Sequence, residues 1–461
     1  MNKSLYRWEF FVDTGGTFTD CLGKGPDGKE VRVKVLSRGS LSAQVVQMVS
    51  DREILLDSET DWPEDFPRGF VISSGAKNQP EIKVEHWSNR ENILILSDEP
   101  TTRFLEGEAI QLFSGWEAPL LAMRLILARE KKSQADCQIK MRLATTRCTN
   151  ALLEDSGEKP VLFLTKGFSD LLEIGDQRRT ELFDLIPQKR RSFAGPCVEV
   201  NERIDRTGKI ITEPDLPSLW FQAKTLANDG HRVAVVSFLN SHINDANEKK
   251  VIEELREIGF EKIIGSAEIY PFINWLPRCE STVLEGYLQP ILDRYLRNII
   301  SRLGQNSELL IMNSAGGLMV PTEYRAINSL LSGPAGGVVG ACSVGKRAGL
   351  NKIINLDMGG TSTDVSRFSN SFGYQNTLLI GDAQLAGVAL DIETVAAGGG
   401  SVCRVENGRL KVGPESAGAF PGPACYGFGG PLCLTDINLL LGRLDEKSFP
   451  TPILIAASEE K

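Results

Sequence analysis

The chain has 461 residues, of which 41% are apolar and 24% charged, a composition typical of a soluble globular enzyme with a large core. Its net charge of -9 and pI near 5.2 supply no basic surface, so neither nucleic acid nor a membrane is an expected partner. No apolar run approaches the roughly 20 residues that cross a bilayer, and no secretory signal opens the sequence, so we expect a cytoplasmic protein.

The cysteines and histidines argue against a zinc hydrolase. Nine cysteines are scattered without a C-x-x-C pair, which indicates reduced thiols. The three histidines, His86, His231 and His242, lack the spacing of zinc ligands. A zinc enzyme is therefore not expected.

Short apolar runs alternate with helical patterns along the chain. Runs rich in β-branched residues predict strands at 9–13, 31–36, 70–75, 161–165, 233–239, 309–314 and 353–358. Apolar periodicity predicts helices at 41–56, 119–132, 244–259 and 280–304. This alternation indicates an α/β fold with a mainly parallel or mixed sheet, in more than one lobe. A charged stretch with Gly and Pro at 187–210 suggests the division 1–205 and 206–461.

One motif occurs twice. FFVDTGGTFTDCLG at 10–23 resembles INLDMGGTSTDVSR at 354–367, and both carry D-x-G-G-T-x-T-D after an apolar strand. Adjacent glycines let backbone N–H groups approach an anion, and threonine hydroxyls add donors. Carboxylates beside such turns repel phosphate unless a hard cation such as Mg²⁺ lies between them. The repeat predicts two strand–turn–strand hairpins that hold a polyphosphate in a cleft; the alternative is two ordinary hairpin turns.

Two further glycine-rich stretches lie at 331–342 and 395–403. Each is a candidate for backbone amides at a helix N-terminus beside a nucleotide. Close helix–sheet packing explains either of them equally well.

Seven stretches together resemble the hydantoinase A/5-oxoprolinase family, and within it the ATP-dependent 5-oxoprolinases: 11–20, 143–154, 165–185, 312–319, 331–342, 356–366 and 395–444. The resemblance implies an actin/sugar-kinase-like fold in which two duplicated lobes clamp ATP and Mg²⁺; a monovalent cation is a further candidate cofactor. It also implies transfer of the γ-phosphoryl group to the amide oxygen of a small cyclic amide. For 5-oxo-L-proline, water then opens the ring to L-glutamate.

The resemblance also assigns residues. The catalytic set is Asp13, Asp20 and Asp357, and the Mg²⁺ set is Asp13, Asp357 and Asp364. The phosphate turns are Gly15, Gly16, Thr17, Gly359, Gly360, Thr361 and Thr363, and the nucleoside is bordered by Gly336, Gly337, Gly398, Gly399, Gly400 and Ser401. Substrate contacts are assigned to Thr145, Thr146, Arg147 and Asn150. Three alternatives stay open: Asp20 and Asp364 act as a base or cap their hairpins, Arg147 is a surface residue, and Thr149 or Asn150 caps a helix.

The family's chains continue well past the stretch that ends at residue 444, whereas this sequence ends at 461. We therefore expect a truncated chain that works with a hydantoinase B-like second subunit or a missing C-terminal half, and that forms an oligomer. Two other functions remain open. One is an N-methylhydantoinase or an ATP-using subunit of an acetone or acetophenone carboxylase, and the other is a non-catalytic nucleotide-binding or scaffold protein.

Overall fold

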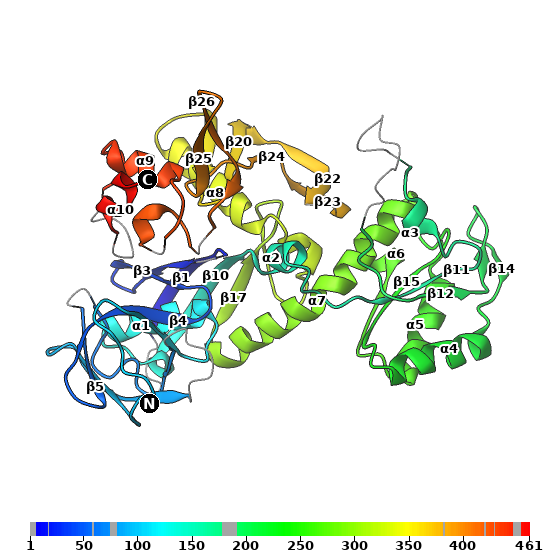
Figure 1. Cartoon of the computed structure of the whole chain (residues 1–461). Helices are drawn as coiled ribbons and strands as arrows, with labels where there is room; N and C mark the ends of the chain where they lie inside the picture. The colour runs from blue at the N-terminus through cyan, green and yellow to red at the C-terminus, as the bar shows by residue number, and fades with distance from the viewer. Residues whose placement is uncertain are drawn as a thin grey trace.

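A computed structural model describes residues 6–16, 18–57, 60–73, 81–177, 191–380, 383–418, 421–427, 429–445 and 453–461. The molecule is a mixed α/β protein with three groups of elements (Figure 1). The long helix α7 (Trp275–Leu303) extends from the large N-terminal sheet toward a smaller four-stranded sheet (Figure 1). In the part of the chain that is described, no helix is both long and apolar enough to cross a membrane.

The first group is a twelve-stranded sheet in the order β18-β17-β10-β1-β2-β3-β4-β5-β8-β7-β6-β9. Its strands are β1 (Tyr6–Thr14), β2 (Phe18–Lys24), β3 (Glu30–Leu36), β4 (Ser40–Met48), β5 (Glu53–Leu56), β6 (Val71–Ser73), β7 (Ile82–Ser88), β8 (Ile93–Leu96), β9 (Ala109–Phe113), β10 (Cys137–Thr145), β17 (Glu308–Met312) and β18 (Leu318–Met319). An additional pairing of β4 with β9 closes six of these strands into a ring. Helix α1 (Ala118–Arg129) packs on β1, β2 and β3.

The predicted helix at 41–56 is wrong, because β4 and β5 occupy this stretch. Leu41, Ala43 and Val45 are buried at alternate positions, which is the periodicity of a strand. Pairing with β5 and β9 satisfies the backbone of β4, and the side chains of Val45 and Ile54 are completely or almost completely buried. The predicted helices at 119–132, 244–259 and 280–304 are confirmed as α1, α5 and α7, with shifted ends.

The second group is a parallel sheet in the order β12-β11-β15-β16 with a core of its own. Its elements are β11 (Val161–Thr165), β12 (Cys197–Val200), β13 (Arg203–Ile204), β14 (Ile210–Thr212), β15 (Val233–Ser237), β16 (Lys262–Gly265), α3 (Leu171–Ile174), α4 (Leu216–Asn228), α5 (Ala246–Ile258) and α6 (Ser266–Ile269). Gly259 ends α5 with a φ of +113°, which a residue with a side chain rarely adopts. The sheet takes strands from both sides of residue 205, and the division there stays a prediction.

The third group contains the second copy of the motif. Its elements are α8 (Ser332–Arg347), β19 (Lys352–Met358), β20 (Thr363–Ser369), β21 (Ser371–Phe372), β22 (Tyr374–Ile380), β23 (Ala383–Leu390), β24 (Ile392–Val395), β25 (Ser401–Glu406), β26 (Arg409–Ser416), α9 (Leu434–Leu440) and α10 (Ile455–Glu459). Helix α8 contacts β10 and β17 of the first sheet as well as β19 and β20. It therefore lies between the two copies of the motif.

Candidate functional site

The two copies of the motif form matching hairpin turns, as predicted. The amide of Gly15 donates to the carbonyl of Phe18 at 3.0 Å, and the amide of Gly359 donates to that of Ser362 at 2.9 Å. In each hairpin the two aspartates of the motif are cross-strand partners, Asp13 with Asp20 and Asp357 with Asp364. The predicted phosphate-turn residue Thr17 lies outside the described residues.

Helix α8 lies beside both hairpins, and one of its glycines is next to each hairpin. A Cβ atom on Gly333 would lie 3.9 Å from Oδ1 of Asp13, and a Cβ atom on Gly337 would lie 3.2 Å from Oδ2 of Asp357. Residues four apart share one face of a helix, so a single glycine face meets carboxylates from both copies. A side chain at 337 would crowd the Asp357 carboxylate. A Cβ atom on Gly336 would lie 4.0 Å from Cβ of Ala144 in β10, and the nucleoside contact assigned to Gly336 and Gly337 stays a prediction.

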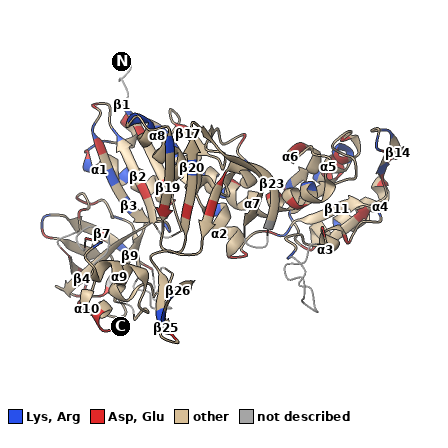
Figure 2. Cartoon of the chain, turned by 90° about the horizontal axis from the view of Figure 1, so that it is seen from above, with Lys and Arg blue, Asp and Glu red and all other residues tan. Residues whose placement is uncertain are grey.

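Asp13 lies at the centre of the site electrostatically. Its pKa is raised to about 6, mainly because protein atoms displace part of its hydration, and further because Asp20 and Asp357 add negative charge. Lys34 acts in the opposite direction. Asp357 belongs to the second hairpin, and its carboxylate lies beside the same glycine face of α8 as that of Asp13, so both hairpins present a carboxylate to this face. In Figure 2 the strands of both hairpins, β1, β2, β19 and β20, lie in the larger part of the molecule, on the side away from α4 and α5, with acidic positions in red.

Lys34 was missed by the sequence analysis. The register of β1, β2 and β3 places Asp13, Asp20 and Lys34 in one row across the strands. The Lys34 Nζ atom lies 3.1 Å from Oδ2 of Asp20. The only sequence signal is a lysine among the alternating valines of VRVKVL, and that pattern does not say which residue stands opposite it.

The second hairpin has a corresponding row, formed by Asp357, Asp364 and Thr394 across β19, β20 and β24. The Thr394 hydroxyl donates to Oδ1 of Asp364 at 2.7 Å. The two rows are therefore alike except at the last position, where one has a cation and the other a hydroxyl. This difference makes the first hairpin the only one of the two with a positive charge in its row.

Residues that follow β10 support the first turn. The amide and the hydroxyl of Thr146 both donate to the carbonyl of Thr14, at 3.0 and 3.1 Å. The side-chain amide of Asn150 lies 3.6 Å from the Cβ position of Gly16. Helix α2 (Arg147–Leu153) begins directly after Thr146. The alternative that Thr149 or Asn150 caps this helix is therefore wrong.

Thr145 and Arg147 are placed differently from Thr146 and Asn150. Thr145 is fully buried, and its hydroxyl accepts from the amide of Arg147 at 3.2 Å. The hydroxyl of Ser332, at the start of α8, donates to the carbonyl of Thr145 at 2.8 Å. The exposed Arg147 side chain lies over the ring of Tyr295. Thr145 thus joins β10 to α8, while the assigned substrate contacts of all four residues stay predictions.

The loop at 398–401 supports the second turn. The amides of Gly399 and Gly400 donate to the carbonyls of Gly359 and Gly360, at 2.9 and 2.6 Å. A Cβ atom on Gly398 would lie 2.7 Å from the backbone of Gly360, so only glycine permits this approach. These two amides are already used within the protein. The assigned nucleoside contact of the loop stays a prediction.

Two more assigned residues lie around the second turn. The Thr363 hydroxyl donates to the carbonyl of Ala397 at 2.5 Å, and the Ser401 hydroxyl accepts from the amide of Gly398 at 2.9 Å. Ser401 is buried, whereas Thr361 is exposed at the turn. Thr361 is therefore better placed than Thr363 or Ser401 for contact with a ligand.

Comparison with known protein families gives two matches. Residues 98–259 match the hydantoinase/oxoprolinase N-terminal region, and residues 278–458 match hydantoinase/oxoprolinase. The chain belongs to the hydantoinase/oxoprolinase family. The two matches together include helix α8 and the whole second hairpin.

Individual members of the family extend this comparison. The 5-oxoprolinase of Saccharomyces cerevisiae is 37% identical over 470 residues, which cover 95% of this chain and 32% of the yeast protein. Nucleotide-free acetone carboxylase superposes with a TM-score of 0.68 at 20% identity, over 99% of this chain and 58% of that one. ATP-dependent caprolactamase from Pseudomonas jessenii superposes with a TM-score of 0.64 at 23% identity, over 98% of this chain and 58% of the caprolactamase chain. The chain thus has the fold of these proteins and spans about a third of the yeast protein.

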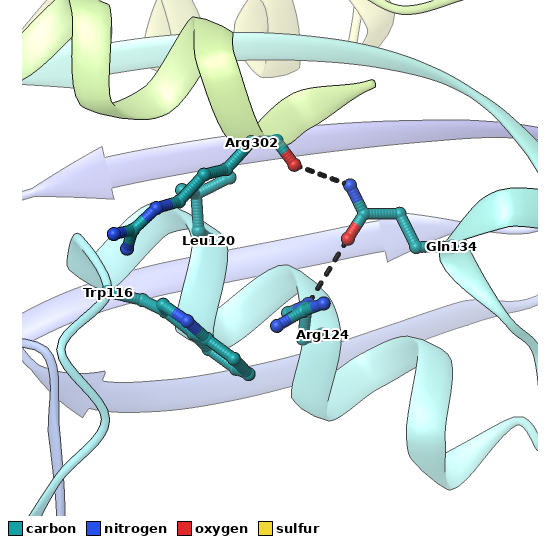
Figure 3. Close-up of a pocket in the computed structure, with 5 residues that line it drawn as sticks. All are labelled: Trp116, Leu120, Arg124, Gln134 and Arg302. Carbon is teal, nitrogen blue, oxygen red and sulfur yellow. Dashed lines mark hydrogen bonds between the residues drawn. The ribbon is translucent and has the colours of Figure 1, made fainter. Parts of the chain in front are cut away.

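A separate pocket of this family member lies away from the hairpins (Figure 3). It has a volume of about 400 Å³ and is lined by Trp116, Leu120, Arg124, Gln134 and Arg302. Gln134 accepts from Nε of Arg124 and donates to the carbonyl of Arg302. Gln134 precedes β10, whereas the hairpins meet its other end, roughly 30 Å away for nine residues at about 3.3 Å each. The pocket is therefore not part of the site between the hairpins.

The carboxylates of the site fit Mg²⁺ better than a metal that needs a full set of protein ligands. Within the described ranges, no three His, Cys, Asp or Glu side chains cluster closely enough to hold a metal by themselves. Mg²⁺ commonly takes one or two carboxylates and completes its octahedron with water and phosphate oxygens. Asp13 and Asp357, one from each hairpin, are suited to that arrangement.

Proposed function

We propose that the chain is the ATP-using part of a cyclic amide hydrolase that opens 5-oxo-L-proline to L-glutamate. The observation that carries the proposal is the pair of matching turns whose aspartates, Asp13 and Asp357, lie beside one glycine face of α8. The 37% identity with the yeast 5-oxoprolinase supports the choice of substrate. The duplicated hairpins also support an actin/sugar-kinase-like arrangement of two lobes.

A nucleotide polyphosphate binds between the two turns in this proposal. In the described part of the chain, no protein acceptor takes the N–H of Gly16 or Gly360. Helix α8 begins beside Asp13 without a side-chain cap, so its first N–H groups and the positive end of its dipole also favour an anion. The exposed hydroxyl of Thr361 adds a donor at the second turn.

The site has more negative than positive charge, and this decides what the residues do. Mg²⁺, when bound, neutralises charge between the phosphate oxygens and the carboxylates. Asp13 and Asp357, one from each hairpin, would hold it. Lys34, whose Nζ atom lies beside Asp20, contributes the positive charge of the first row and would attract a phosphate oxygen. Such a site transfers a phosphoryl group by positioning and charge neutralisation, without a protein nucleophile.

The chain acts together with a hydantoinase B-like subunit or a C-terminal half in this proposal. The activated amide formed by phosphoryl transfer must still be hydrolysed. The yeast protein is about three times as long as the region that matches this chain, which leaves room for such a part.

Binding of Mg·ATP tests the proposal most directly. We expect Mg·ATP to raise the melting temperature of the wild-type chain and of Asp229→Asn, a carboxylate at the end of α4 far from the site. Asp357→Asn should abolish the rise. The proposal is wrong if Mg·ATP does not stabilise a cooperatively folded wild type, or if it stabilises Asp357→Asn equally.

Substrate choice needs a second experiment. ADP release is measured with the chain and a hydantoinase B-like subunit in the presence of 5-oxoproline, caprolactam, N-methylhydantoin, or acetone with bicarbonate. We expect 5-oxoproline to stimulate it most. Stimulation by another compound alone would assign the same site to that substrate, and stimulation by none would favour a non-catalytic protein.

A further inference from the structure

The two copies of the motif differ in what lies beside their first strands. Strand β1 has a neighbour on each edge, the antiparallel β2 and the parallel β10. Strand β19 occupies the same position in the second copy and pairs with the antiparallel β20. In the part of the chain that the structure describes, no strand pairs with the other edge of β19. Among the described residues, the second copy therefore has no counterpart of β10.

The outer faces of these two strands differ as well. In the aligned motifs Phe10 corresponds to Ile354, and Val12 to Leu356. Phe10 and Val12 are 0% and 4% exposed. Ile354 and Leu356 are 80% and 66% exposed. Met358 continues the row on β19 at 43%. Three alternate apolar side chains, Ile354, Leu356 and Met358, are thus exposed on β19, whereas the corresponding residues of β1, Phe10, Val12 and Thr14, are buried.

Helix α1 accounts for the burial in the first copy. It packs on β1, β2 and β3, and its Ile126 reaches the Cβ position of Gly23, which pairs with Phe10. The opposite face of β19 is covered by α8, against which Ile353 packs. The nearby helices α9 and α10 pack on each other, and neither makes substantial contact with β19. The described residues contain no helix that covers the outer face of β19 as α1 covers β1.

A long apolar strand with a free edge is a site for pairing with another polypeptide. Single exposed apolar side chains are common on protein surfaces, but here three share one face of a strand that pairs along one edge alone in the described part of the chain. Val365 of β20 and Val395 of β24 lie on the same face by register, and Val395 is also exposed. The apolar surface therefore extends over three strands.

We propose that the free edge and outer face of β19 bind a helix–strand unit of another polypeptide region. Its strand runs parallel to β19, as β10 does beside β1, and its helix lays an apolar face on Ile354, Leu356 and Met358, as α1 does on the first sheet. The region that supplies it is the one that directly follows the match to this chain in the relatives. This chain covers 58% of each solved relative, so both contain further polypeptide.

Hydrogen exchange tests this proposal. The yeast 5-oxoprolinase region that directly follows its match is joined behind residue 461, and amide exchange of 352–358 is compared with that of the chain alone. We expect exchange of these amides to slow at least tenfold in the fusion. The double variant Ile354→Lys/Leu356→Lys should remove the slowing. The matched control Leu379→Lys/Leu410→Lys, at two exposed positions on other strands, should keep it.

Several outcomes overturn the proposal. One is unchanged exchange of β19 in this fusion and in a second fusion that carries the corresponding region of the caprolactamase. Another is slowing that persists in the Ile354→Lys/Leu356→Lys variant while exchange of β1 shows that the first sheet is intact. A third is a dimer of the chain alone with β19 already protected, because a second copy would then be the occupant.

Discussion

Replacing Asp13 by asparagine should make the free protein more stable and the nucleotide-bound protein less stable. Asp13 carries a pKa of about 6 instead of 3.8, because the folded state disfavours its charge. Below pH 4 the aspartate is protonated in both states and costs nothing. Between pH 4 and 6 the unfolded chain ionises first, so stability falls as the pH rises, and above pH 6 the full penalty remains. Asparagine removes this penalty.

The size of the effect follows from the shift. Two pKa units correspond to roughly 3 kcal/mol, and because the Asp13 carboxylate is still open to solvent we reduce this to about 1 kcal/mol. Mg·ATP acts in the other direction. At a hundredfold excess over Kd it stabilises the wild type by about 2.7 kcal/mol, and the loss of the carboxylate should remove most of this.

Thermal unfolding at pH 4 and pH 8, with and without Mg·ATP, measures both effects. We expect Asp13→Asn to melt on the order of 1 °C above the wild type at pH 8 without ligand, level with it at pH 4, and below it with Mg·ATP. Asp229→Asn serves as the control at each condition. The reasoning fails if Asp13→Asn is the less stable protein at pH 8, if its gain persists at pH 4, or if Mg·ATP stabilises both proteins equally.

Three further predictions concern the surroundings of the site. Burial raises the pKa of Glu285 to about 7, and Glu285→Gln keeps an acceptor for the amide of Ile327. The variant should therefore stabilise the protein by about 2 kcal/mol at pH 8 and by progressively less toward pH 4.5. Melting curves across this pH range check the prediction, and a loss of stability at every pH contradicts it. Lys34→Gln should weaken Mg·ATP binding about tenfold, as measured by calorimetry. It should hardly change the stability of the protein, because exposed ion pairs contribute about 0–1 kcal/mol. An affinity equal to that of the wild type would remove Lys34 from the site. Gly337→Ala should weaken Mg·ATP binding by crowding Asp357, whereas Gly340→Ala on the same helix meets no atom within 4 Å and should bind normally; identical binding by the two variants would contradict the placement of α8.

Local pattern was sufficient for the hairpins. The paired D-x-G-G-T-x-T-D segments predicted two strand–turn–strand units, because an apolar strand followed by two glycines specifies a tight turn through interactions within a few residues. The same hydrogen bond closes both turns, from Gly15 to Phe18 and from Gly359 to Ser362. The α/β class followed from the alternation of strand and helix patterns.

Long-range pairing decided the rest. The stretch 41–56 has a local pattern compatible with a helix, and it forms β4 and β5 because β9 and β8 supply partners. Lys34 joins the site through the register of β3 against β2, which no local pattern encodes. Asp13 and Asp357 are 344 positions apart in the sequence, and only the placement of α8 between the sheets brings their charges to one site. The sequence by itself therefore determined which turns form, because a turn depends on its own few residues. The tertiary structure determined which side chains face one another across the turns, because a facing pair depends on how distant segments pack.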